Sequence, residues 1–349
     1  MAIPRVLWWF RLWPFWKTFF EGLGCRVVTN DPARPTPRHH DRASTIVEEA
    51  CFPIQLLLDR TLAIAGQADM VFMPRLISIV PRGIMCPRFT GVPDIVQMVL
   101  GPDRRVLAPV IDARLGRSSI RNAYLEVAAQ LGALAAVGRQ AFRRATAMEA
   151  QFEAEFEMRL NQLPTPDVFD PQRQTGMAHR PGRRQDARPT VPDRPPGQRN
   201  HSQPSTSMPR VALLGHPYIA FDWEFNLELV QKLRNLGLWI VPVESIPRKR
   251  IESSVRRLDK NVYWSSGREV LGAALSFFEN GGIDGLIYLS CFKCGVDGLL
   301  LDVVRWAARH QSQVAYLSLT LDGHDNEMGL VTRLEAFADI VRRRARKTN

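Results

Sequence analysis

The sequence predicts an α/β protein built from two doubly wound, Rossmann-like parallel sheets that a basic linker joins. Short apolar runs of strand type alternate with longer helical patterns in both halves of the 349 residues. Between the halves, residues 164–209 lose this periodicity and are rich in Pro, Arg, Gln and Ser, a composition typical of a disordered linker. We therefore expect a first α/β domain at 1–163, ending in helices, and a second α/β domain with a basic tail at 210–349.

The apolar periodicity and the positions of Pro and Gly assign the elements in order. In the first half we expect strands at 3–9, 25–29, 69–73, 76–80 and 105–112, and helices at 14–22, 54–65, 93–100 and 118–163. In the second half we expect strands at 210–214, 238–243, 285–289 and 315–319, and helices at 226–236, 267–279, 299–309 and 330–344.

The net charge of +11 lies almost entirely in the linker and the tail. Residues 171–209 hold seven Arg against two Asp, and residues 342–347 hold five basic side chains. The parts expected to fold are therefore close to neutral, which argues against a nucleic-acid partner.

Five scattered cysteines argue against a disulfide scaffold. The apolar start of the chain is interrupted by Arg11, Pro14 and Lys17, which fits neither a signal peptide nor a membrane span, so we expect a cytoplasmic protein without membrane attachment.

Two thiols lie in a turn that follows one predicted strand and precedes a helix, Cys291 and Cys294. Such turns at the carboxyl ends of parallel strands are where α/β folds place ligands. Cys51 and Cys86 each come shortly before a predicted helix with Pro near its start, where a thiolate is stabilised. A Cys-x-x-Cys pair alone has three interpretations: a dithiol redox pair, half of a metal site, or chance.

The remaining motifs exclude some kinds of metal, nucleotide and catalytic site but do not assign a reaction. Zinc would need a second closely spaced Cys or His pair, and none is present. A 4Fe-4S cluster takes thiolates from separate turns if these converge, which would unite Cys51, Cys86 and one or both of Cys291 and Cys294. The sequence has neither a nucleotide-binding glycine motif nor a nucleophile elbow, so it assigns no catalytic residue.

Both halves contain an ordered set of short motifs. They are Ile3-Pro4-Arg5, Trp16-Lys17-Thr18-Phe19-Phe20, Glu49-Ala50-Cys51-x-Pro53, Pro74-Arg75, Cys86-Pro87, Gly91-x-Pro93-Asp94, Leu214-Gly215-His216-Pro217-Tyr218, Leu271-Gly272-Ala273-Ala274, Phe292-x-Cys294-Gly295-x-Asp297 and Thr332-Arg333-Leu334-Glu335-Ala336-Phe337. This set resembles the acyl-CoA dehydratase activase-related proteins, relatives of the iron-sulfur subunits of 2-hydroxyacyl-CoA dehydratases.

The resemblance implies that Cys51, Cys86 and Cys294 bind a 4Fe-4S cluster. Cys291 stands where relatives usually carry another residue, so it is either a fourth ligand or a neighbouring thiol. His216, His324 and Glu327 lie in turns after predicted strands. They would either orient a ligand and tune the cluster or satisfy loop backbone groups. Gly323 replaces a carboxylate that relatives carry, which weakens an acid-base role for that loop.

The function that the resemblance implies is an iron-sulfur redox component that accepts a low-potential electron from an ATP-dependent activase. The substrate would be a CoA thioester, a second dehydratase-like subunit is a candidate partner, and the reaction would be that of a 2-hydroxyacyl-CoA dehydratase-like lyase or a related reductase. The alternative is a non-catalytic, cluster-carrying or regulatory partner of the activase. Without a nucleotide-binding motif, the chain is not expected to be the ATPase itself.

Overall fold

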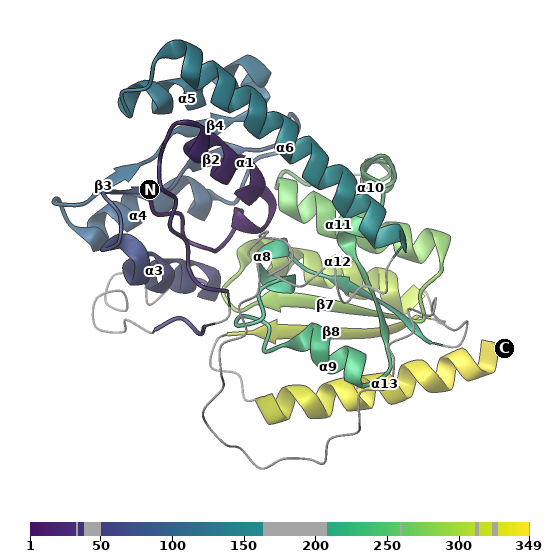
Figure 1. The fold of residues 1–349 in the computed structure, drawn as a ribbon. Helices are drawn as coiled ribbons and strands as arrows, with labels where there is room; N and C mark the ends of the chain where they lie inside the picture. Colours follow the sequence, from purple (N-terminus) through teal and green to yellow (C-terminus); the bar gives the residue numbers. More distant parts are fainter. Residues whose placement is uncertain are drawn as a thin grey trace, which may run out of the picture.

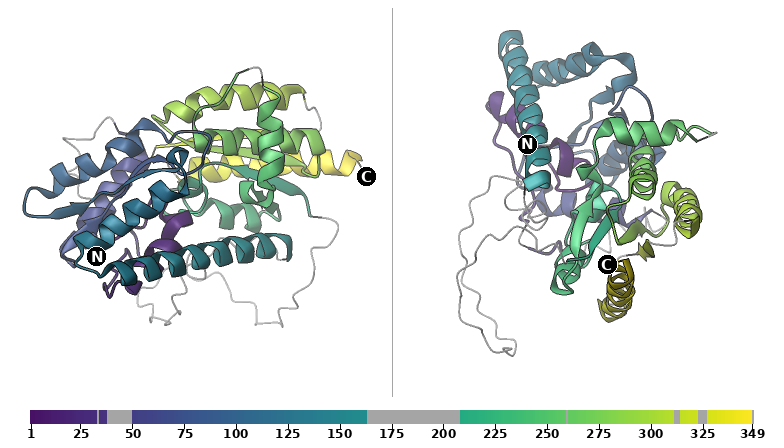
Figure 2. Two further views of the ribbon diagram at one scale, coloured as in Figure 1. Left: turned by 90° about the horizontal axis from the view of Figure 1, so that it is seen from above. Right: turned by 90° about the vertical axis from the view of Figure 1, so that its right-hand side faces the viewer.

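A computed structural model describes residues 1–32, 34–37, 50–162, 208–258, 260–310, 314–322 and 327–348. Nearly all of the predicted linker at 164–209 lies outside these ranges. The first half lies beside the second, as the purple-to-blue and green-to-yellow parts of Figures 1 and 2 show. Parallel strands alternate with helices, which confirms the predicted α/β class.

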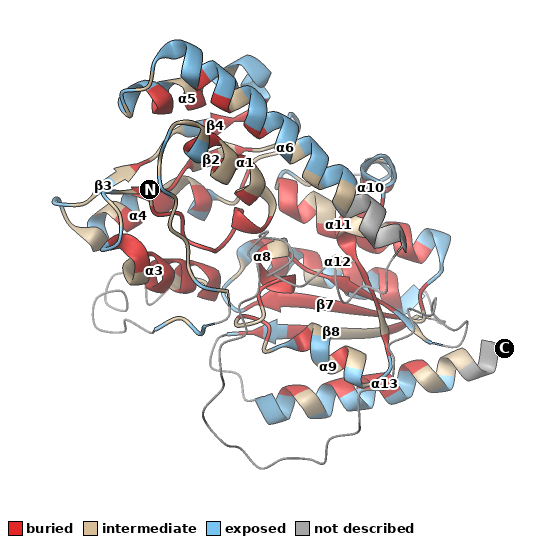
Figure 3. Cartoon of the chain, in the orientation of Figure 1, coloured by how far each residue is buried: buried red, intermediate tan, exposed pale blue. Residues whose placement is uncertain are grey.

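The second half is built on one parallel sheet of order β6-β5-β7-β8. Its strands are β5 (Arg210–Leu214), β6 (Trp239–Pro242), β7 (Gly285–Cys291) and β8 (Ala315–Leu321). All seven residues of β7 are buried, as expected for a central parallel strand covered on both faces (Figure 3). Every predicted strand of this half is present: β5 has the predicted bounds, and the other three have shifted ends.

Helices cover both faces of this sheet. The side chains of Leu286 and Tyr288 pack in one cluster with α10 (Arg248–Arg256), α11 (Ser265–Asn280) and α12 (Gly295–His310). The alternate residues Ile287 and Leu289 pack in another with α9 (Leu229–Asn235) and α13 (Glu327–Thr348). Because side chains alternate along a strand, this division shows that the second half is doubly wound.

The first half contains shorter parallel pairings. β1 (Met70–Phe72) pairs with β3 (Arg105–Leu107), and β2 (Arg75–Ser78) pairs with β4 (Val110–Asp112). The backbone N–H of Met73 donates to the Leu107 oxygen at 3.0 Å, and that of Arg75 donates to the Pro109 oxygen at 2.9 Å. These bonds make the two pairings one interrupted ladder, with prolines at the interruption because they have no N–H to donate.

Apart from α1 (Trp9–Gly22) at the start of the chain, four larger helices and three short ones complete the described part of the chain. The larger ones are α3 (Phe52–Ala65), α4 (Pro87–Leu100), α5 (Arg117–Gln130) and α6 (Ala135–Gln162). The short ones are η1 (Ala113–Leu115), α8 (Pro217–Ala220) and η2 (Val243–Ser245). Helix α6 extends from the first half toward the second and contacts η2 (Figure 1). No described helix is both long and apolar enough to cross a membrane.

The predicted strand at 3–9 is wrong, and the one at 25–29 shrinks to a single bridge. At the start of the chain, Ala2 forms single bridges with Val28 and Val71, after which the chain turns and α1 runs over Trp9–Gly22. Leu7 adopts a φ of 54°, which ends the extended backbone. The buried aromatics of α1 follow helical spacing through Pro14, so packing overrides the expected start at that proline; they include Trp9, Trp13, Trp16 and Phe20.

Glu244 should make the stability of the protein depend on pH. Its burial and the nearby Glu269 raise its pKa from 4.5 to about 8. Between these values the unfolded chain binds fewer protons than the folded one, so the free energy of unfolding should fall as the pH rises. Glu244→Gln should remove this loss and stabilise the protein by roughly 1–3 kcal/mol at pH 8.

Urea denaturation at pH 5 and at pH 8 measures this effect, because these pH values lie close to the unfolded pKa of 4.5 and the folded pKa of about 8. The exposed Glu335→Gln is the matched control and should follow the wild-type protein. Identical pH dependence in Glu244→Gln and the wild-type protein would contradict the prediction.

Candidate functional site

Three cysteines from the two halves stand directly before helices. Cys51 is the N-cap of α3 and Cys86 is the N-cap of α4, each followed by Pro in the first turn, and Cys294 immediately precedes α12. The predicted placement of Cys51 and Cys86 before helices is therefore confirmed. A helix N-terminus carries free N–H groups and partial positive charge, which stabilise thiolates.

The turn from β7 into α12 presents two thiols on one short segment. Cys291 is the buried last residue of β7, and the N–H of Cys294 donates to the Cys291 oxygen at 3.2 Å. Lys293 adopts a left-handed φ of 64°, which lets the chain reverse within this turn. The Asp297 N–H donates to the Cys294 sulfur at 3.4 Å.

Four thiols influence one another, so the turns meet at one place. The Cys291 thiol hydrogen-bonds to both Cys51 and Cys294. These bonds lower the pKa of Cys51 to about 7 and that of Cys294 to about 6, and they raise the pKa of Cys291. Burial raises the pKa of Cys86, and the charges of Cys294 and Cys51 raise it further. We call Cys51, Cys86, Cys291 and Cys294 the thiol cluster.

His216 lies beside the thiol cluster in a buried polar network. Its Nε2 lies 3.1 Å from Asp297 Oδ1, and the Tyr288 hydroxyl donates to the same oxygen at 3.0 Å. Burial alone would lower the pKa of His216, but Asp297 and Cys294 outweigh it and raise the pKa well above its usual value. The His216 ring is therefore positively charged beside the thiolates.

The backbone places this histidine by a close approach of two strands. Gly215 ends the turn after β5, and a Cβ on it would come within 2.8 Å of the Leu289 oxygen of β7. Only glycine allows β5 and β7 to come so close at this point. His216 follows as the N-cap of α8 and stacks on Tyr218, with ring centroids 5.2 Å apart.

The site also contains buried polar atoms without partners. His216 Nδ1 and Asp297 Oδ2 make no hydrogen bond within the described part of the chain. Leaving such an atom unsatisfied costs about 1–3 kcal/mol, which favours a site that takes a ligand. Donor atoms of His216, Cys294 and Asp297 lie within 4.8 Å of one another. Asp297 is already engaged with His216, so we interpret it as orienting the ring rather than binding a metal.

Of the two other residues predicted for the site, one lies on the surface and the other lies outside the described residues. Glu327 begins α13 and is 66% exposed, and its ion pair with Lys232 at 2.9 Å ties α13 to α9. His324 lies outside the described residues. The roles of His216, His324 and Glu327 toward a cofactor, like the ligand roles of the cysteines, stay predictions.

A buried ion-pair network near the site was not predicted from the sequence. Arg60 of α3 donates to both carboxylate oxygens of Asp222, with Nη2 3.0 Å from Oδ1, and to Glu224 at 2.8 Å. Arg60 and Asp222 are at most 2% exposed. This network joins α3, which Cys51 begins, to the loop after α8, which His216 begins. We call Arg60, Asp222 and Glu224 the interdomain ion-pair network.

Nothing in local sequence marks these residues, because 162 positions separate Arg60 from Asp222. Asp297, in contrast, could be recognised from the sequence, because a carboxylate three residues after Cys294 lies in the first turn of the following helix.

The low pKa values of Cys51 and Cys294 make these two thiols reactive in the metal-free, reduced protein. At pH 7, Cys294 should react with iodoacetamide on the order of ten times faster than Cys25, because the thiolate is the nucleophile. The pKa of Cys294 is about 6, whereas burial raises that of Cys25 above its usual value of 9.0. Peptide mass spectrometry of timed samples measures both rates. Equal rates would contradict the electrostatics described above.

Fold and site together define an α/β protein whose two halves enclose a cysteine-rich centre at helix N-termini. Residues 1–246 match the family model described as "CoA enzyme activase uncharacterised domain (DUF2229)", and the chain belongs to this activase-related family. The matched range contains Cys51, Cys86 and His216, and it ends before Cys291 and Cys294. No curated protein matches the chain significantly.

Proposed function

We propose that the chain is an iron-sulfur redox protein of the activase-related family, in which the thiol cluster holds one 4Fe-4S cluster between the two halves. The observation that carries this proposal is the meeting of four thiols from four separate chain positions around three helix N-termini. Neither a structural thiol nor a simple disulfide needs so many cysteines in one place, whereas a 4Fe-4S cluster takes up to four thiolates.

The donor set and its surroundings fit such a cluster. Two of the thiols have lowered pKa values, and a metal ligand must be a thiolate. The helix N-termini, the His216 cation and Arg88, whose charge lowers the pKa of Cys51, offset the negative charge of bound thiolates. When bound, the cluster supplies one-electron chemistry at low potential.

The residues around the thiol cluster supply positive charge and fix the orientation of the His216 ring. Asp297 and Tyr288 fix the His216 ring, whose free Nδ1 is available to donate a hydrogen bond to a ligand. Hydrogen bonds of this kind raise the reduction potential of a cluster. Cys291 hydrogen-bonds to two of the other thiols, so we propose it as the fourth ligand.

The proposed place in a reaction is that of an electron-accepting partner of an ATP-dependent activase, acting on a CoA thioester. The family description supports a connection with CoA enzyme activases. The absence of a nucleotide-binding motif supports a component other than the ATPase. A second candidate role is a cluster carrier or regulator without its own turnover. Turnover of a 2-hydroxyacyl-CoA with activase, ATP and reductant separates the two.

Anaerobic reconstitution tests the proposal. Iron and sulfide quantitation should give about four of each per chain, with a broad visible absorption that reductant bleaches. A colourless protein that retains no iron after anaerobic reconstitution would overturn it.

The hydrogen bond between Cys291 and Cys294 supports one rival function, a dithiol redox pair. In that case the two thiols would lose two electrons and two protons to an oxidised partner and form a disulfide. Cys51→Ala and Cys86→Ala would then leave the redox behaviour unchanged. Under the iron-sulfur proposal, both variants lose it.

A further inference from the structure

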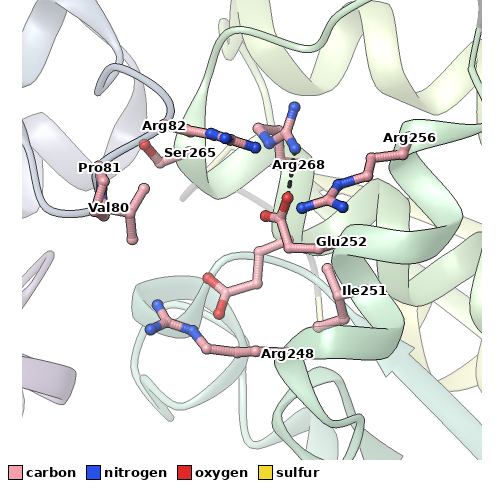
Figure 4. A pocket seen from close by; sticks show the side chains of 10 residues that line it. Val80, Pro81, Arg82, Arg248, Ile251, Glu252, Arg256, Ser265 and Arg268 are labelled. Atoms are coloured by element: carbon pink, nitrogen blue, oxygen red, sulfur yellow. Dashed lines mark hydrogen bonds and ion pairs between the residues drawn. The ribbon is translucent and has the colours of Figure 1, made fainter. Parts of the chain in front are cut away.

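A cavity lies at the boundary of the two halves, apart from the thiols. Its volume is about 410 Å³, which is within the range of small-molecule sites. Residues 80–82 of the first half form one wall, and α10 and α11 of the second half form the others. Figure 4 shows Arg82, Arg256 and Arg268 directed toward the space above Glu252, with Arg248 on the opposite side. We call this cavity the arginine pocket.

The two glutamates of the arginine pocket are already neutralised. Glu252 pairs with Arg268 at 2.7 Å, and Glu269 pairs with Arg11 of α1, outside the pocket, at 3.2 Å. Among the described residues, the side chains of Arg82 and Arg256 make neither an ion pair nor a hydrogen bond. The pocket therefore holds an excess of positive charge that no neighbouring carboxylate offsets.

Arg248 adds to this charge, although it also interacts electrostatically with Glu149 of α6. Helix α10 as a whole carries four basic residues against one acidic residue. Ser265, the first residue of α11, lines the pocket, which brings a helix N-terminus to its edge. Gathering like charges around a concave surface costs free energy that a bound anion would recover.

From this geometry we propose that the arginine pocket binds a ligand through a phosphate or diphosphate group. Guanidinium groups form paired hydrogen bonds with phosphate oxygens, and several of them around one cavity match a multiply charged anion. This inference goes beyond the proposed function and does not require a cluster. A nucleotide and the phosphorylated end of CoA share this chemistry.

The position of the pocket gives a bound ligand contacts with both halves. Ile84 forms a bridge with Trp264, and the Ser265 N–H donates to the Ile84 oxygen at 2.8 Å. The same segment continues to Cys86. A ligand in the pocket would therefore touch the first half at Arg82 and the second half at Arg256, and its binding should raise the melting temperature of the protein.

Calorimetric titration of the full-length protein with inorganic pyrophosphate at low ionic strength tests the proposal. We expect saturable binding that added salt weakens. Arg82→Gln and Arg256→Gln should each weaken it about tenfold, the effect of losing one charged hydrogen bond. Arg257→Gln is the matched control, because Arg257 is next in sequence but pairs with Glu279 outside the pocket. It should bind as the wild-type protein does.

Parallel titrations with ADP, CoA and dephospho-CoA identify the source of the phosphate by the tightest binding. Repeating the pyrophosphate titration on a variant with Ala at all four positions of the thiol cluster separates this inference from the iron-sulfur proposal, because binding should persist there. No saturable binding of pyrophosphate by the wild-type protein would overturn the inference. Equal affinities of Arg82→Gln, Arg256→Gln and Arg257→Gln would also overturn it.

Discussion

Asp222→Asn should lower the free energy of unfolding by about 3–5 kcal/mol, the usual cost of removing one partner of a buried ion pair. The side chain of Asp222 is fully buried and accepts hydrogen bonds from Arg60 and from the backbone of Phe225. Its loss leaves the Arg60 guanidinium, which is 2% exposed, with Glu224 as its one remaining charged partner among the described residues. Arg5 increases the cost, because it is a second buried cation nearby whose charge acts on the same carboxylate.

Urea denaturation followed by circular dichroism measures this loss. The control is Arg305→Gln, which breaks the exposed Arg305–Asp302 pair and should cost less than about 1 kcal/mol. If Asp222→Asn and Arg305→Gln destabilise the protein equally, the interdomain ion-pair network does not hold the halves as described.

The second large effect is expected in iron content. Cys51→Ala, Cys86→Ala and Cys294→Ala should each reduce the iron bound after anaerobic reconstitution by about tenfold, because each removes a thiolate that no nearby residue replaces. Alanine is used because a serine oxygen can still bind iron. Cys25→Ala is the control, since Cys25 shows no interaction with the thiol cluster among its described contacts.

Cys291→Ala distinguishes four ligands from three. As the proposed fourth ligand, Cys291 should be replaceable with partial retention of iron, but the paramagnetic resonance spectrum of the reduced protein should change because one iron becomes open to solvent. Wild-type iron content in Cys86→Ala would contradict the ligand assignment itself.

The sequence reveals much of the second half because its signals are local. Each buried strand is an apolar run of suitable length, and each helix begins or ends near Gly or Pro. The same logic places Cys51 directly before a helix, since Pro53 favours a first helical turn. After Cys86 the helix was expected from Pro93, whereas α4 already begins at Pro87. Spacing alone did not predict that these turns converge, because they lie in different halves with separate sheets. They meet only if the halves face each other, and the family resemblance was what implied it.

The errors arise where distant contacts decide the conformation. The first apolar run suits a strand as well as a helix, and burial of its aromatic face under α6 favours the helix. The ion-pair partners of Arg60 are in the other half of the chain, so no local sequence pattern predicts them. Cys291 appeared to be part of a loop, whereas β7 extends to include it, and this extension buries its thiol between Cys51 and Cys294.

The central claim is that the thiol cluster holds a single 4Fe-4S cluster. Mössbauer spectroscopy of protein reconstituted anaerobically with isotopically enriched iron tests it most directly, because it separates cubane clusters from mononuclear iron. We predict that the spectrum of the wild-type protein is dominated by one 4Fe-4S species, which is absent from Cys86→Ala and retained in Cys25→Ala. Absorption from mononuclear iron alone, or the same spectrum in all three proteins, would contradict the claim.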